Sequence, residues 1–337
     1  MTPTATDPLV QRLCSRVAVL RGLDPATVRA TPLSDGAGWP RFVVEVKDRD
    51  VSLVVRLPNA PVGAETPAPS HAAGAGASYV DEADTLAQVA PLGLAPMTLQ
   101  LEPADGLWVY PLWSGTPVST EPLRDPERLA RIGRAFRLLH ISGLTLRGQH
   151  DPFDGMDTDA LWTRDTALDL PPDSLNAVAE AAARSRDALQ RGPAAPAPCL
   201  NAPGPEACFD TGTRVMFVDW LGAAMGDPHI ELARLIERAG LGPEQVAALL
   251  DAYFGAGAGG SARDRVTVAQ LPAAYRRLLD LRRAVADAPA ETETETADPR
   301  QRLRHQVEAC QAMIDSPAWT EAMERLNAKR PRTARRS

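Results

Sequence analysis

The chain has 337 residues, of which 44% are hydrophobic and 23% are charged, and its formal net charge is −7. This composition predicts an ordinary globular protein with a large apolar core, and the negative charge argues against a general nucleic-acid binder. No apolar run approaches the roughly 18 residues that a membrane-spanning helix needs, and no signal peptide opens the sequence. We therefore expect a cytoplasmic protein whose partners include neither nucleic acid nor membrane.

The N-terminal third has the pattern of a small sheet with helices. Residues 7–20 carry apolar side chains at helical spacing, which predicts an opening helix. Two β-rich runs, 42–46 and 51–57, flank a polar turn and predict two adjacent strands. The other elements expected here are one helix and two strands, at residues 77–92, 97–101 and 107–112.

The rest of the chain is predicted to be mostly helical. Asp125 followed by Pro126 is a strong helix start, because an N-cap side chain precedes proline at the first helical position. The apolar residues of this helix form one stripe: Leu129, Ile132, Phe136 and Leu139. Further helices are predicted at 243–254, 271–285 and 302–314. The polar run 288–298 predicts an exposed linker.

The four cysteines lack the spacing of a metal site. They are Cys14, Cys199, Cys208 and Cys310. We expect buried, reduced thiols, as in a cytosolic protein.

The most informative stretch lies between residues 199 and 220. Residues 199–212 read Cys-Leu-Asn-Ala-Pro-Gly-Pro-Glu-Ala-Cys-Phe-Asp-Thr-Gly, and Val-Asp-Trp follows at 218–220. This order resembles the catalytic loop and metal-binding strand of bacterial choline kinase-like phosphotransferases, relatives of the aminoglycoside phosphotransferases. Their loop reads approximately Cys-His-x-Asp-x-x-x-x-Asn-Phe-Leu-Asp-Thr-Gly. The matching positions are Cys199, Glu206, Asp210, Thr211 and Gly212.

The resemblance implies an α+β, two-lobed protein kinase-like fold. Residues 1–113 would form an N-lobe with an opening helix, a five-stranded antiparallel sheet and one further helix. Residues 114–328 would form a mostly helical C-lobe that carries the degenerate catalytic loop at 199–212 and the metal strand at 215–220. Residues 329–337 would be a basic, disordered tail.

Two working groups of the family loop are missing from this chain. Ala202 stands at the place of the catalytic aspartate and Ala207 at that of the metal-binding asparagine, while Leu200 replaces the preceding histidine. A methyl group can neither accept a proton nor hold Mg²⁺. No intact catalytic residue is therefore expected in the loop. Because a positioned base contributes about 10²–10⁴ in rate, we expect catalysis to be strongly impaired.

Other residues retain the family pattern for nucleotide binding. The resemblance implies that Arg56, late in the third strand, reaches the phosphates and pairs with Glu82 on the next helix, and that Asp219 holds a metal ion. From the residues alone, Arg56 and Glu82 could equally be solvated surface charges. Asp219 lies inside an apolar run and needs a partner there, either Mg²⁺ or backbone N–H groups. His140 is expected to be a hydrogen-bonded structural residue.

Three functions remain open at this point. The first is a pseudokinase, a catalytically impaired family member whose binding of ATP and Mg²⁺ is retained, weakened or lost. The second is an active ATP-dependent phosphotransferase that acts on a small hydroxyl-bearing substrate and uses Glu206 or Asp210 as an unusual base. The third is a kinase-shaped module that works through protein contacts. Choline is a doubtful ligand, because residues 275–314 contain one tyrosine and no tryptophan for cation–π contacts.

Overall fold

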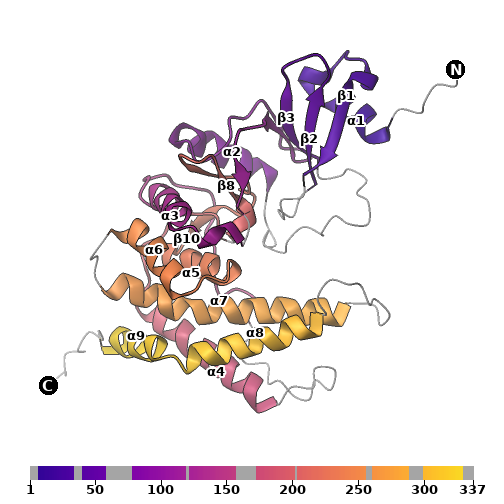
Figure 1. The fold of residues 1–337 in the computed structure, drawn as a ribbon. Coiled ribbons are helices and arrows are strands. Elements are labelled where there is room, and N and C mark those ends of the chain that lie inside the picture. The colour runs from indigo at the N-terminus through magenta and orange to yellow at the C-terminus, as the bar shows by residue number, and fades with distance from the viewer. Residues whose placement is uncertain are drawn as a thin grey trace.

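The computed structural model describes residues 7–33, 40–57, 78–118, 121–156, 172–201, 203–255, 260–287 and 299–328. They form a sheet-bearing N-lobe and a larger helical C-lobe, with the long helices α7 and α8 at the end of the molecule away from the sheet (Figure 1). Three features of the sequence analysis lie outside the described ranges: Ala202, the linker at 288–298 and the tail at 329–337.

The N-lobe contains a five-stranded antiparallel sheet in the order β1-β2-β3-β5-β4. Its elements are α1 (Pro8–Arg16), β1 (Val28–Pro32), β2 (Arg41–Val46), β3 (Ser52–Arg56), α2 (Tyr79–Val89), β4 (Gln100–Glu102) and β5 (Leu107–Pro111). The predicted opening helix is shorter than expected, because it ends at Arg16 and a separate 3₁₀ turn occupies Ala18–Leu20.

The two faces of this sheet belong to two different cores, as the alternation of side chains along a strand requires. Val55 packs on the outer face with Leu13 of α1. Val54 packs on the inner face, in a core that includes Leu86 of α2 and continues through Phe136 into the C-lobe. The inner face of the sheet is therefore fixed to the C-lobe by continuous apolar packing.

The C-lobe is built around α7, a 28-residue helix that contacts α4, α5, α8 and α9. The lobe's helices are α3 (Pro126–His140), α4 (Pro172–Arg191), α5 (Pro228–Arg238), α6 (Pro243–Phe254), α7 (Gly260–Asp287), α8 (Pro299–Ile314) and α9 (Pro317–Ala328). The predicted start of α7 at residue 271 is wrong, because the helix continues through Pro272, a residue that more often opens a helix. α6 has the predicted bounds.

Short strands lie between the two lobes and flank the 199–210 loop, which corresponds to the family's catalytic loop. They are β6 (Thr116–Pro117), β7 (Ala197–Cys199), β8 (Cys208–Asp210), β9 (Val215–Phe217) and β10 (Ala224–Gly226). β8 pairs with β6 and β9, and β7 pairs with β10. These two small sheets hold the two ends of the 199–210 loop. Among the described helices, none combines the length and the apolar character needed to cross a bilayer.

Candidate active site

A cavity of about 180 Å³ lies between the inner face of the sheet and the strands β8 and β9. Val54 and Tyr110 line it from the N-lobe, and Met216 and Val218 line it from the C-lobe. The connection at 111–113 closes one side. Its walls are mainly apolar, and its volume is below the roughly 300–1,000 Å³ of ordinary ligand pockets. The cavity therefore suits a flat ring, with any charged part of a ligand extending beyond it.

The predicted ion pair between Arg56 and Glu82 is present, and both residues lie in the N-lobe. Arg56 at the end of β3 donates to both carboxylate oxygens of Glu82 on α2, at 2.7 and 2.6 Å. The Arg56 Nε donates to the carbonyl of Gly106 at 3.0 Å, and the guanidinium lies over the rings of Tyr79 and Trp108. Both charged side chains are buried. Their role in nucleotide binding stays a prediction.

A second cation in this region, Arg41, was missed by the sequence reasoning. Arg41 opens β2 directly opposite Arg56 in the sheet, is 3% exposed and lines the cavity. Its Nη1 donates to the carbonyl of Val218, at 3.4 Å, and so connects the N-lobe to the strand end before Asp219. The sequence shows only a charged residue at the start of an apolar strand, which is too common to mark a site.

The beginning of the catalytic loop is held by buried hydrogen bonds. Asn201 adopts a left-handed backbone conformation with φ of 70°, which asparagine tolerates better than most residues. Its N–H donates to Glu231 at 2.7 Å, and its side-chain amide donates to backbone carbonyls, including that of Gly222. Arg234 donates to the Asn201 carbonyl. The residue before Ala202 is thus fixed, while Ala202 itself lies outside the described ranges.

The position of the family's asparagine is occupied by a buried methyl group. Ala207 ends a 3₁₀ turn, Pro205–Ala207, and its carbonyl accepts the N–H of Val218 at 2.9 Å. This bond places the loop beside the segment that carries Asp219, as the resemblance implied. Asp219 is half-buried.

These residues do not fit the two Mg²⁺ ions that the family loop implies. Mg²⁺ requires oxygen ligands in near-octahedral geometry, commonly one or two carboxylates together with water and phosphate oxygens. Asp219 offers one carboxylate, and Ala207 offers no ligand atom. Of the two metal-holding positions in the family pattern, only one can coordinate an ion here.

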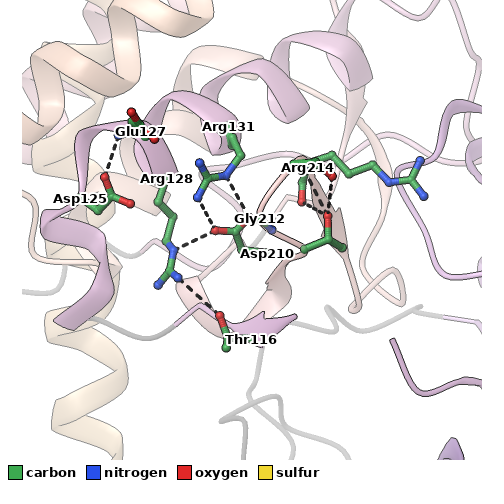
Figure 2. Close-up of polar contacts among 10 residues, drawn as sticks. Thr116, Asp125, Glu127, Arg128, Arg131, Asp210, Gly212 and Arg214 are labelled. Atoms are coloured by element: carbon green, nitrogen blue, oxygen red, sulfur yellow. Dashed lines mark hydrogen bonds and ion pairs between the residues drawn. The ribbon is translucent and has the colours of Figure 1, made fainter. Parts of the chain in front are cut away.

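Asp210, one of the two candidate substitute bases, is held by two arginines from α3 (Figure 2). Arg131 donates to both of its oxygens, at 3.0 and 2.7 Å, and Arg128 adds a bond at 2.9 Å. The N–H of Gly212 donates a further bond at 3.0 Å. Burial alone would raise the pKa of Asp210, but the hydrogen bonds from Arg131 and Gly212 and the charge of Arg131 lower it below its ordinary value. A carboxylate in this setting is a weak proton acceptor.

Glu206, the other candidate base, lies in the same loop and lines the cavity. Its carboxylate forms an ion pair with Arg238 of α5. It also crowds Gly204, where an added Cβ would lie 2.2 Å from the Glu206 oxygens. Because these oxygens are the far end of a flexible side chain, a larger residue at position 204 would require Glu206 to shift.

His140 belongs to a buried network behind the loop, which confirms that it is hydrogen-bonded, while its structural role stays a prediction. Its two ring nitrogens lie 2.6 Å from the Tyr253 hydroxyl and 2.6 Å from Glu231. Glu231 uses its other oxygen for the Asn201 N–H. Cys199 lies in the same cluster, and burial strongly raises the pKa of its thiol. All four cysteines are free, and all but Cys14 are buried.

Three solved structures resemble this one over nearly their whole length. A choline/ethanolamine kinase family protein from Mesorhizobium loti has a TM-score of 0.74 and 24% identity, covering 96% of this chain and 99% of that one. The Streptococcus pneumoniae choline kinase LicA, in complex with AMP, has a TM-score of 0.62 and 14% identity, covering 90% and 99%. An ethanolamine kinase from Plasmodium vivax has a TM-score of 0.63 and 9% identity, covering 94% and 89%.

These likenesses confirm the two-lobed protein kinase-like fold. No curated protein sequence matches the chain. The sequence pattern of the phosphotransferase enzyme family, however, matches residues 29–266, well over half of the chain. The chain therefore belongs to the phosphotransferase enzyme family, and its structural neighbours include choline and ethanolamine kinases and aminoglycoside phosphotransferases.

Proposed function

We propose that this protein is a pseudokinase that binds a nucleotide in the cavity between its lobes and transfers phosphate poorly or not at all. One observation carries the proposal: both carboxylates of the described loop that could replace the missing base are already held by arginines. Glu206 pairs with Arg238, and Asp210 is bound by Arg128 and Arg131. With alanine at 202 and 207, the loop keeps the flanking residues of the family pattern but lacks the catalytic aspartate and the metal-binding asparagine.

The cavity supports the nucleotide half of this proposal. Its apolar walls and volume of about 180 Å³ match a planar base, and the buried Arg56–Glu82 pair keeps the sheet and α2 in the arrangement the family uses. The structural neighbour LicA has been crystallised with AMP. An adenine nucleotide is accordingly the first ligand to test.

An active enzyme that uses a substitute base is less well supported. Asp210 accepts three hydrogen bonds from arginines, and its lowered pKa weakens it as a base. A general base works best when its pKa lies near the working pH. No contact among the described residues favours the third function, a module that acts through protein contacts alone. The two experiments below separate it from the first.

Nucleotide binding is tested by thermal unfolding of the purified chain with and without ATP. A ligand that binds only the folded state raises its stability by mass action, by about 2.7 kcal/mol at one hundred times the dissociation constant. We expect ATP to raise the melting temperature, and we expect Val54→Trp, which fills the cavity, to abolish that rise. A wild-type protein that ATP does not stabilise would leave the protein-contact module as the better function.

Catalysis is tested by following ATP consumption with amino alcohols, aminoglycosides and sugars as acceptors. We expect rates at the background of the assay. Turnover of about 1–100 s⁻¹, as in ordinary kinases, that disappears in Asp219→Ala would refute the pseudokinase proposal. Replacing Glu206 and Asp210 singly by their amides would then identify the base.

A further inference from the structure

We propose that this protein binds its nucleotide without a divalent metal ion, because the guanidinium of Arg41 supplies positive charge at the phosphates. The inference rests on the nucleotide site proposed above and specifies how its charge is balanced. It concerns the edge of the cavity where Arg41 meets Val218, the residue directly before Asp219.

The first support is the position of Arg41. In the antiparallel pairing of β2 and β3, Arg41 lies opposite Arg56, and Val43 lies opposite Val54. Side chains two residues apart share a face, so Arg41 projects from the same inner face as the cavity-lining Val54. It lines the cavity itself. A ligand whose ring contacts Val54 would therefore extend its charged part toward Arg41.

The second support is the state of Arg56, the cation that the family pattern assigns to the phosphates. Three of its N–H groups are used, two by Glu82 and one by the Gly106 carbonyl. Its guanidinium is covered by the rings of Tyr79 and Trp108, and the residue is 2% exposed. Among the described residues that line the cavity, Arg41 is the one cation.

The third support is the metal side of the site. Arg41 donates to the carbonyl of Val218, the residue directly before Asp219. The Arg41 guanidinium therefore contacts the segment that carries the one remaining metal-holding carboxylate, and its positive charge disfavours a second cation in the same region. The methyl of Ala207 replaces the other ligand. The site therefore lacks the asparagine ligand of the family pattern, and it has the guanidinium of Arg41 in the same region.

Guanidinium chemistry suits this substitution. Arginine is always charged, and its planar fork of N–H groups matches phosphate oxygens in two-point contacts. Mg²⁺ neutralises the same oxygens in ordinary family members. A side chain that is already buried at the site supplies charge without an ion that must be recruited from solution.

The experiment compares ATP binding by calorimetry in excess EDTA and in excess MgCl₂, using the full chain. We expect equal affinities for the wild type in the two conditions. Arg41→Met should lose about 10–100-fold in affinity, the equivalent of a hydrogen bond to a charged group of about 1.5–3 kcal/mol. Arg41→Lys, which keeps the charge without the fork, should fall between them. The matched control is Arg29→Met, on the exposed part of neighbouring β1.

The outcomes separate this inference from the function beneath it. Binding that requires MgCl₂ would overturn the inference and leave the proposed function standing. Tighter ATP binding by Arg41→Met would have the same meaning, because Arg41 would then block the site. An absence of binding in both conditions would overturn the proposed function as well. If Arg41→Met does not fold, as judged by its melting temperature without nucleotide, the wild-type comparison of EDTA with MgCl₂ still decides.

Discussion

Arg56 and Glu82 form a doubly hydrogen-bonded ion pair whose side chains are 2% and 0% exposed, and the Arg56 guanidinium lies over the rings of Tyr79 and Trp108. A buried pair of this kind stabilises little compared with an apolar pair of the same shape, yet removing one partner leaves an uncompensated charge in the interior. Its two members therefore depend on each other.

Breaking this pair should be costly. We expect Glu82→Ala to lower the free energy of unfolding by about 3–5 kcal/mol, whereas the double variant Arg56→Met/Glu82→Leu should lose less than either single variant. Urea unfolding measures both. Arg147→Ala serves as the control, because Arg147 is 65% exposed in its pair with Asp81, and exposed pairs contribute about 0–1 kcal/mol. A loss in Glu82→Ala no larger than this control would contradict the prediction.

Asp227 should stabilise the protein down to unusually low pH. It caps α5 through the His229 N–H at 2.9 Å and pairs with Arg265 at 2.6 Å. Burial alone would raise its pKa, but the hydrogen bond from His229 and the charge of Arg265 lower it from 3.8 to about 2.

A lowered pKa means that the contribution is complete above the unfolded value and is lost as pH falls through the folded value. The stability difference between wild type and Asp227→Asn should thus be constant above about pH 4 and shrink between pH 4 and 2. Chemical denaturation across this range tests it, with Asp251→Asn, at an exposed ion pair, as control. A difference that does not change with pH would be contrary to expectation.

Restoring the two missing groups should create activity. We expect Ala202→Asp/Ala207→Asn to raise ATP turnover by about 10²–10⁴, the usual contribution of a positioned base. Ala202→Asn/Ala207→Asn is the matched control, since it has nearly the same shape without the base. A double variant that folds and binds ATP but stays at background would show that other residues, such as Leu200, limit catalysis.

Close packing of α3 on α6 should make Gly133 intolerant of substitution. A Cβ at this position would lie 2.6 Å from the carbonyl oxygen of Leu249 and 3.1 Å from the Cβ of Ala252. We expect Gly133→Ala to lower the free energy of unfolding by about 1–3 kcal/mol through overpacking. This loss should appear although alanine favours the helix over glycine by about 1 kcal/mol. Gly192→Ala, where a Cβ meets nothing within 4 Å, should be nearly neutral. Urea unfolding of both variants provides the comparison.

Much of the fold could be predicted because local patterns and the family order agree. The Arg56–Glu82 pair follows from a strand and helix in the family's sequence, and α6 from its apolar spacing. The predicted start of α7 was wrong. Pro272 favours a helix that begins near residue 271, but tertiary packing overrides this preference and α7 continues through the proline.

The site was harder to predict because its contacts join residues that are far apart in the chain. Arg131 and Asp210 are 79 residues apart, and Arg41 and Val218 are 177 apart. Nothing near either arginine in the sequence distinguishes it from the many others in this chain. The alanines at 202 and 207, in place of the family's aspartate and asparagine, could be read from the sequence. The arginines that pair with the remaining carboxylates could not.

The division of the sheet between two cores has a consequence for how the molecule opens. The outer layer, with Leu13 and Val55, has an apolar cluster of its own, while Val54 on the opposite face is joined to Phe136 across the lobes. Local unfolding follows such cooperative units. Amide protons of α1 and β1 should accordingly exchange with solvent long before those of α3, because the outer layer can unfold locally while the two lobes stay packed.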